Sequence, residues 1–317
     1  MGSNRHAPGS RTLVDYVGLL ASGFAMGASN MVPGVSGGTM ALILGIYEEL
    51  IDSIRGVVNP EAIKLLLRFK VKQALALLPW KFLLSVAVGM LAAVLTLAHF
   101  LDWMLREHAV LLWSFFFGLV AASILTVGKR IQKWGAKPIV GAAIGAITLF
   151  VIVGLVPLET PNAPWFLFLS GAVAICTMVL PGISGAFILV LLGKYQFALS
   201  AVTNRDYLTL VLIAAGAAVG IVTFTQVLSR LLKRYPDTTV GVLAGMMLGS
   251  LRKIWPWKET LSLVANSQGE MVPLKQVNVL PAAWTLETTL ALVLAMLGFA
   301  IVFVLTSLAS RRGRREG

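Results

Sequence analysis

Ten long apolar segments constrain the fold of this chain more than any other feature. A helix that spans a bilayer needs roughly 20 apolar residues, and the 317 residues are 57% hydrophobic and only 13% charged. A soluble domain of this composition would precipitate, so the bilayer must be the solvent for most of the chain. We therefore predict an all-α integral membrane protein. The segments lie at about residues 12–32, 35–54, 81–103, 109–127, 138–157, 164–180, 183–202, 207–231, 238–251 and 286–309.

An internal repeat divides the chain into two halves. Aligning Pro33 with Pro181, an offset of 148 residues, places MVPGVSGG on VLPGISGA and continues for about 33 residues without a gap. A weaker match at an offset of 127 residues extends the repeat, for example from Gly89 to Gly216. Each half then holds five segments, an odd number, so we predict two inverted-topology repeats, as in secondary transporters. Whether the first two segments of each half cross fully or form re-entrant hairpins stays open.

The two offsets differ by 21 residues, which places an insertion in the first half at about residues 56–79. Glu61, Lys64, Arg68 and Lys72 fall at helical spacing there, which predicts an amphipathic helix at the membrane surface. A solvated linker helix is the alternative. The predicted divisions are an N-terminus at 1–11, a first membrane repeat at 12–157, a second at 164–309 with an external loop at about 252–285, and a basic tail at 310–317.

The distribution of lysine and arginine predicts the orientation. The formal net charge is +12, but the basic residues sit at the ends of apolar segments. Orientation rules and anionic membrane lipids account for them there, so we expect no nucleic-acid partner. The N-terminus, the insertion, the 128–137 and 230–234 loops and the tail are basic, whereas PLETPNAP at 157–164 has no basic residue. We expect both termini in the cytoplasm and PLETPNAP outside.

One connection does not fit this distribution. The 252–285 loop must be external, yet it holds Arg252, Lys253, Lys258 and Lys275. Because long loops follow the charge rule weakly, we keep the predicted orientation.

Two Pro-Gly sequences interrupt the apolar segments at aligned positions, PGVSGGT from Pro33 and PGISG from Pro181. Proline removes a backbone donor and glycine relaxes the backbone, so each sequence ends one helix and starts another. The new helix presents free N–H groups, hydroxyl groups and a positive dipole end, which favour an anion. Two such ends would hold one phosphate or carboxylate near the midplane; a close-packed kink of small residues is the alternative. The candidate substrate-binding residues are Asn30, Pro33, Gly34, Ser36, Gly37, Gly38, Thr39, Pro181, Gly182, Ser184 and Gly185.

Charges beside the apolar segments are further candidates, for the two mouths of a pathway or for ion coupling. Glu48 and Glu49 follow the first break by about 18 Å of helix, which places them at the cytoplasmic mouth. Lys194 takes the symmetric place at the external mouth, and Tyr47 and Tyr195 are aligned neighbours of these charges. Ordinary anchoring at the membrane interface is the alternative.

No constellation of catalytic or metal-binding residues appears in the sequence. The three histidines are scattered, and the single cysteine, Cys176, lies inside an apolar run. Without a Walker loop, ATP hydrolysis is not the predicted energy source. We expect a protein that is not an enzyme and needs no cofactor, and coupling to a proton or sodium gradient stays open.

The sequences GFAMGASNMVPGVSGGTMALILGIYEELI and VLPGISGAFILVLLGKY resemble the polyprenyl-phosphate transporter family. The resemblance runs from about residue 12 to residue 309. It implies a flippase of the bacterial cytoplasmic membrane that returns undecaprenyl phosphate from the outer to the inner leaflet for cell-wall precursor recycling. The polyprenyl phosphate and anionic membrane lipids are then the expected partners. In that setting Lys194 would attract the phosphate outside, and Glu48 and Glu49 would disfavour its retention inside.

Other functions compete with this one. An ion-coupled transporter or channel for a small soluble anion needs the same anion site but no opening toward the lipid. A membrane enzyme that acts on lipid phosphates would need a nucleophile or a metal cluster, and a packing scaffold would need no transport. The sequence leaves open the exact lipid, the coupling ion and the oligomeric state.

Overall fold

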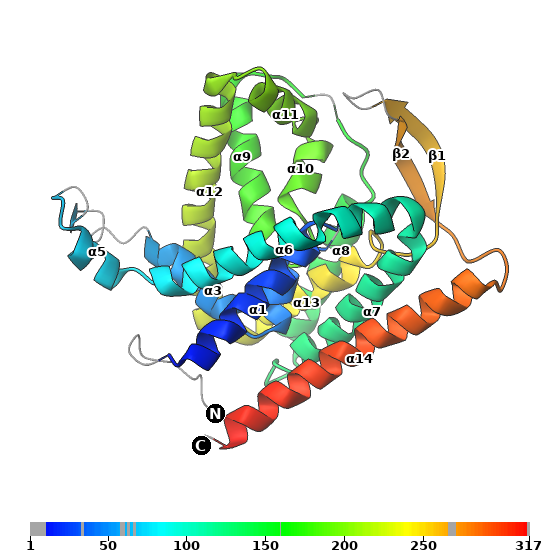
Figure 1. The fold of residues 1–317 in the computed structure, drawn as a ribbon, viewed down its shortest axis with the longest axis horizontal. Helices are drawn as coiled ribbons and strands as arrows, with labels where there is room; N and C mark the ends of the chain where they lie inside the picture. Colours follow the sequence, from blue (N-terminus) through cyan, green and yellow to red (C-terminus); the bar gives the residue numbers. More distant parts are fainter. Residues whose placement is uncertain are drawn as a thin grey trace.

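The computed structural model describes residues 11–32, 35–57, 61, 64–65, 68–158, 160–265 and 271–315. These residues are mainly helical, with one β-hairpin (Figure 1). The first half contains α1 (Leu13–Asn30), α2 (Gly37–Ile43), α3 (Tyr47–Val57), α5 (Val71–Leu77), α6 (Trp80–Glu107), α7 (Ala109–Gly128) and α8 (Ala136–Ile152). The second half contains α9 (Pro164–Val179), α10 (Gly185–Leu191), α11 (Tyr195–Thr203), α12 (Tyr207–Arg234), α13 (Pro236–Ser250), β1 (Lys258–Ala265), β2 (Met271–Asn278) and α14 (Leu286–Arg315).

Each predicted apolar segment contains helix, and the sequence explains where several helices begin. Thr12 and Asp15 form a capping box at the start of α1, and a proline opens α9 and α13, where its missing N–H costs nothing. Among the described residues, four helices are long and apolar enough to cross a membrane: α6, α7, α12 and the Leu286–Val304 part of α14. A fifth span results if α10 and α11, bent by 102° at their break, are counted together. The chain is thus a multi-pass membrane protein.

The sequence repeat reappears in the packing of the helices. Helix α1 packs on α6 and α9 packs on α12, while α7 packs on α14 and α8 on α13. Gly23 of α1 lies against the backbone carbonyl of Val86 so closely that a Cβ would not fit, and Gly171 of α9 lies in the same way against Ile213. The first residues of these two contacts differ by 148 positions and the second by 127, which are the offsets of the sequence alignment. Close helix contacts through small residues are typical of membrane proteins. The opposite orientation of the two halves stays a prediction.

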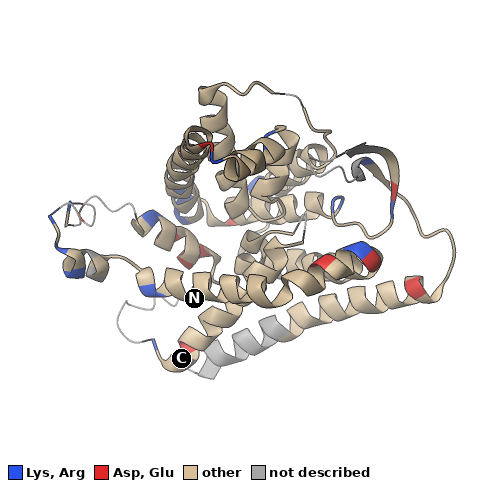
Figure 2. Cartoon of the chain, turned by 45° about the horizontal axis from the view of Figure 1, so that its top comes forward, with Lys and Arg blue, Asp and Glu red and all other residues tan. Residues whose placement is uncertain are grey.

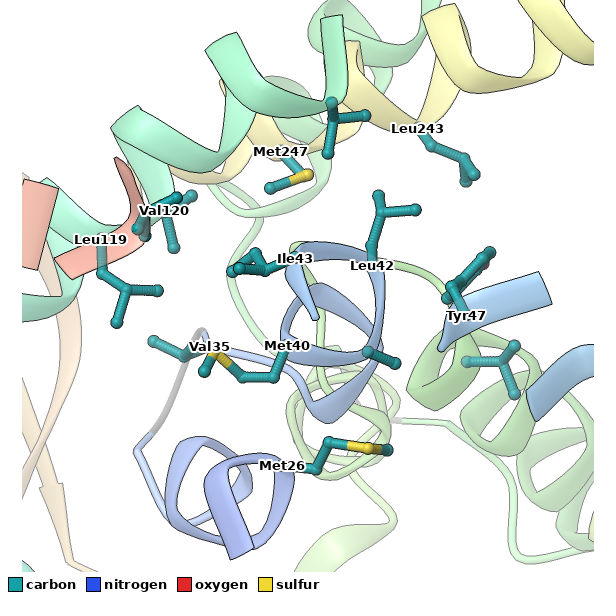
Figure 3. Packing of buried hydrophobic residues seen from close by; sticks show 14 of the residues in the cluster. Met26, Val35, Met40, Leu42, Ile43, Tyr47, Leu119, Val120, Leu243 and Met247 are labelled. Atoms are coloured by element: carbon teal, nitrogen blue, oxygen red, sulfur yellow. The ribbon is translucent and has the colours of Figure 1, made fainter. Parts of the chain in front are cut away.

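The core is centred on the short helix α2, all of whose residues are buried. Leu42 and Ile43 of α2 face Leu243 and Met247 of α13, and Val120 of α7 lies nearby (Figure 3). The first broken helix therefore lies in the middle of the molecule. Charged residues, in contrast, lie mainly at helix ends and in connections (Figure 2).

Two connections differ from their predictions. The 252–285 segment, expected as a loop, contains the antiparallel strands β1 and β2, in which Lys258 pairs with Asn278. In the insertion, Phe69 has a φ of 56° and α5 begins only at Val71, so one continuous amphipathic helix is wrong. The reason is that a residue in the left-handed conformation cannot continue a right-handed helix, and Phe69 lies between Arg68 and Lys72 of the predicted stripe. Helix α5 and the hairpin lie at opposite ends of the molecule (Figure 1).

Candidate functional site

The two broken helices begin in the same way. Ser36 precedes α2, and its hydroxyl accepts a hydrogen bond from the Thr39 N–H at 3.1 Å. Ser184 precedes α10, and its hydroxyl accepts a hydrogen bond from the Phe187 N–H at 3.2 Å. Both serines are therefore N-caps, which satisfy one of the free donors at each helix start.

The two breaks lie against each other. The Gly182 N–H donates to the Thr39 hydroxyl at 2.9 Å and to the Ser36 hydroxyl at 3.3 Å. The Ser36 hydroxyl lies 3.2 Å from the Leu180 carbonyl, to which it donates. Gly182 has a φ of 91°, a conformation that favours glycine. We call Ser36, Thr39, Leu180 and Gly182 the central polar cluster.

The central polar cluster is closed in this conformation. Ser36 and Thr39 have no exposed surface, and the cluster's hydroxyl and N–H groups bond one another. We predicted that the two helix starts together hold one anion. In this structure the N–H groups of Thr39 and Gly182 are instead paired within the protein, which avoids the cost of unpaired groups in an apolar surrounding. An anion could reach them only if these hydrogen bonds opened.

Neighbouring predicted residues support this contact. The Gly37 N–H donates to the Asn30 side-chain oxygen at 2.6 Å. Gly38 lies against the backbone carbonyl of Val179, where a Cβ would not fit, and Gly185 similarly lies against Ala174. Pro181 is buried beside them. Pro33 and Gly34 lie outside the described residues.

The three residues predicted at the cytoplasmic mouth differ in their exposure to solvent and in their partners. Glu48 is exposed, and Glu49 forms an ion pair with Arg11. Tyr47 is fully buried, and its hydroxyl has no hydrogen-bond partner in the part of the chain that the structure describes. Tyr47 is therefore a core residue rather than part of a mouth.

Lys194 does not present its charge at an open surface. It is 1% exposed, and its ammonium group donates to the Thr160 carbonyl at 2.7 Å and to the Asn162 side-chain oxygen at 2.6 Å. It also lies over the rings of Phe166 and Phe197. A buried cation needs oxygen acceptors, and the 160–162 connection supplies them. The ammonium therefore links this connection to the break between α10 and α11.

A cavity of about 1050 Å³ opens beside the second broken helix. We call it the hairpin cavity, because β1, β2 and the connection after α13 form one wall and the ends of α8, α10 and α11 form the other. Tyr195, the aligned partner of Tyr47, lines it and is 40% exposed. The volume is at the upper end of ordinary ligand sites. Four basic residues line the cavity: Arg252, Lys253, Lys258 and Lys275.

A second cavity of about 700 Å³ lies between α8, α12 and α13 and reaches Leu180. Its lining is mainly aliphatic and aromatic, and Lys137 is the charged residue among the lining side chains. We call it the apolar cavity. It suits a hydrocarbon better than a polar ligand, because its walls offer few hydrogen-bond partners.

A cluster of apolar side chains separates the two cavities. Leu149 and Val153 of α8 pack there on Ile188 and Leu191 of α10, together with Ile183. We call these five residues the plug. Val153 and Leu191 also line the hairpin cavity, while Leu180 and Met246, which pack on the plug, line the apolar cavity. Both cavities therefore lie along the α8 and α13 pair, on either side of the plug.

Sequence reasoning assigned no function to the basic residues of the hairpin cavity. Arg252, Lys253, Lys258 and Lys275 appeared only as exceptions to the charge rule for an external connection. That exception was the feature of the sequence that could have revealed them. Basic residues in an external connection are not explained by the orientation rule and therefore need another explanation. Their meeting in one cavity depends on the hairpin, which was not predicted.

The groups that these two sites offer are donors and cations. Within the described ranges, no three His, Cys, Asp or Glu side chains gather into a possible metal site. The central polar cluster supplies hydroxyl and N–H donors, and the hairpin cavity supplies cations. Such donors suit an anion that is bound and released.

Comparisons with known proteins point to one family. The family model described as undecaprenyl phosphate translocase-like matches residues 26–272. A polyprenyl-phosphate transporter of Vibrio cholerae serotype O1 is 40% identical over 304 residues, which cover 94% of this chain and 98% of that protein. A polyprenyl-phosphate transporter of Staphylococcus aureus is 30% identical over 256 residues, which cover 75% of this chain and 85% of that protein. No solved structure matches the chain. The resemblance seen in the Pro-Gly motifs is confirmed, and the chain belongs to the undecaprenyl phosphate translocase-like family.

Proposed function

We propose that this protein is a flippase that returns undecaprenyl phosphate from the outer to the inner leaflet of the bacterial cytoplasmic membrane. Its relatives are named polyprenyl-phosphate transporters, which supports transport rather than catalysis. The observation that carries the proposal is the arrangement of a basic cavity and an apolar cavity along one helix pair, on either side of the plug. A lipid phosphate has the matching chemistry, an anionic headgroup on a long hydrocarbon tail.

The proposed path uses the closed central polar cluster as the barrier. Breaking the hydrogen bonds of Gly182 leaves buried donors unpaired, which costs several kcal/mol for each group in an apolar surrounding. A phosphate that accepts from the same donors replaces the lost bonds, and two positive helix ends stabilise its charge. The cluster therefore opens with a headgroup present and stays shut without one, while the tail remains in the bilayer.

The proposed orientation places the hairpin cavity on the external side. This follows from the predicted topology of inverted repeats with cytoplasmic termini. The positions of α5 and the hairpin at opposite ends of the molecule support it, since the insertion was predicted to be cytoplasmic (Figure 1). The exposed Glu48 then faces the cytoplasm and disfavours retention of the phosphate there.

Leaflet exchange in reconstituted vesicles tests the proposal. Protein in liposomes should move fluorescent undecaprenyl phosphate between leaflets, measured by the fraction that a membrane-impermeant quencher reaches over time. Vesicles without protein give the background rate. An exchange rate equal to background contradicts the proposal. Uptake of labelled inorganic phosphate without lipid exchange would instead establish a transporter for a small soluble anion.

A further inference from the structure

Four basic residues meet in the hairpin cavity from three neighbouring elements. Arg252 and Lys253 follow α13 directly, Lys258 begins β1, and Lys275 lies on β2. The turn after α13 and the pairing of β1 with β2 bring them to one wall of the cavity. Arg252 and Lys275 are exposed, whereas Lys253 and Lys258 are partly buried.

Aromatic rings, rather than carboxylates, accompany these cations. The Lys253 ammonium lies 4.8 Å from the ring centre of Phe187, and the Lys258 ammonium lies 4.2 Å from that of Trp113. Arg252 lies 4.4 Å from the ring centre of Phe150. Among the residues with a described position, no ion pair joins any of the four to an acidic side chain. A ring face attracts a cation without supplying an oxygen acceptor, so N–H donors that point away from the ring stay available to a ligand.

The two partly buried ammonium groups have unused donors. The Lys258 ammonium donates one hydrogen bond, to the Lys253 carbonyl at 2.6 Å, and no described residue accepts one from the Lys253 ammonium. Each ammonium carries three donors. Lys194 is the contrasting case, because two oxygens accept from its ammonium and its position is explained by the protein alone.

Partial burial without a counter-charge destabilises the charged form of these lysines. Burial, together with the neighbouring charge of Lys253, lowers the pKa of Lys258 to about 7. Burial also lowers the pKa of Lys253. A bound anion would reverse both effects, since a nearby negative charge favours the ammonium form.

We infer that the hairpin cavity is a binding site for a phosphate monoester, held by the ammonium groups of Lys253 and Lys258 with Arg252 at the rim. The site is separate from the central polar cluster, because none of the four residues of that cluster lines the hairpin cavity. The apolar part of the cavity wall, which includes Phe117, Val190 and Leu248, would contact the first isoprene units of a lipid. The site deepens the proposed function and rests on it for the lipid as the source of the phosphate. In that setting it is the loading site for the headgroup.

Calorimetric titration of the full-length protein in phosphatidylcholine nanodiscs tests the site. Farnesyl phosphate is the probe, inorganic phosphate tests the headgroup alone, and farnesol tests the tail alone. We expect saturable binding of farnesyl phosphate, weaker binding of inorganic phosphate and no competition by farnesol. The Lys253→Gln/Lys258→Gln variant should bind farnesyl phosphate about tenfold more weakly or worse, because charge-assisted hydrogen bonds are lost.

Matched variants separate a lost site from a lost fold. Lys81→Gln/Lys133→Gln removes two exposed charges far along the chain from the hairpin and should bind as the wild type does. Lys253→Arg/Lys258→Arg keeps both charges and should retain binding. Equal affinity of the glutamine variant and the wild type for farnesyl phosphate would overturn the site. Equal affinity of the wild type for inorganic and farnesyl phosphate would keep the anion site but overturn its assignment to a lipid.

The outcomes also distinguish this inference from the proposed function. If the glutamine variant loses binding while the wild type exchanges no lipid in vesicles, the site stands and the flippase proposal fails. If the wild type exchanges lipid and the glutamine variant binds and exchanges equally well, the flippase proposal stands and the site fails.

Discussion

The two broken helices carry the same motif at aligned positions but lie in different surroundings. Every residue of α2 is buried, and Tyr47, which follows it, has no exposed surface. In the aligned helix α10, Ala186 and Val190 are exposed, and the following Tyr195 is 40% exposed. A near-symmetric sequence has thus folded into an asymmetric arrangement, with one break packed shut and the other beside a cavity.

We propose that the described structure is one conformation of an alternating pair, which rests on the predicted inverted repeat. In transporters with inverted repeats, exchanging the arrangements of the two repeats moves the opening from one side of the membrane to the other. The described conformation has its cavity on the hairpin side of α10. The opposite conformation would bury Tyr195 and expose Tyr47, whose unpartnered hydroxyl would then meet water.

The largest expected effect comes from filling the closed break. Gly38→Val should abolish lipid exchange, because Gly38 touches the Val179 carbonyl and has no room for a Cβ. Ala186→Val, the change at the aligned position of the second break, should leave most of the activity because Ala186 is exposed. Exchange rates of both variants at equal membrane levels give the comparison. If both variants lost lipid exchange equally, the difference in burial between the two breaks would have no effect on function.

A smaller difference is expected between the two N-cap serines. Ser36→Ala removes bonds to Thr39, Leu180 and Gly182 and should destabilise the protein by about 1–3 kcal/mol, since buried groups lose partners. Ser184→Ala removes a helix cap and should cost about 1 kcal/mol. Denaturant or thermal unfolding in detergent measures both. A larger cost for Ser184→Ala would contradict the assignment of the central contact to Ser36.

The smallest effect concerns the pH dependence of the hairpin cavity. The pKa of Lys258 is lowered to about 7, so its ammonium form is lost as the pH rises above that value in the empty cavity. Lys253, Arg252, Lys275 and Tyr195 face the same space. Affinity for farnesyl phosphate should therefore fall several-fold between about pH 7 and pH 9, because proton uptake must accompany binding. Lys258→Arg should flatten the profile, and an unchanged slope in that variant would exclude Lys258 as the titrating group.

The helices and breaks could be predicted from the sequence because their signals are local. Apolar runs, the Pro-Gly pairs and the capping serines act within a few residues, and α2 and α10 begin where Ser36 and Ser184 predict. The related contacts of Gly23 and Gly171 were not predicted, but they follow the offsets of the sequence repeat.

The surroundings of the candidate residues could not be predicted in the same way. Lys194 was predicted at the external mouth, with interface anchoring as the alternative, but it is buried and its ammonium donates to two oxygens 32 and 34 positions away. Tyr47 was a candidate for the mouth or for ion coupling, with interface anchoring as the alternative, but α2 and its neighbours enclose it. The basic cavity requires β1 and β2 to pair, and their short alternating pattern is weak within an apolar sequence.

The accessibility of positions 47 and 195 decides whether the two breaks alternate between a buried and an exposed state. Each position would be replaced by cysteine in a Cys176→Ala background, in vesicles, and treated with a membrane-impermeant thiol reagent on each side. Without lipid, we expect the cysteine at 195 to react from the hairpin side and the cysteine at 47 not to react. During exchange of undecaprenyl phosphate, the cysteine at 47 should become reactive from the opposite side while the reactivity of the cysteine at 195 falls. Simultaneous reaction at both positions, or no change when lipid is exchanged, would contradict the account.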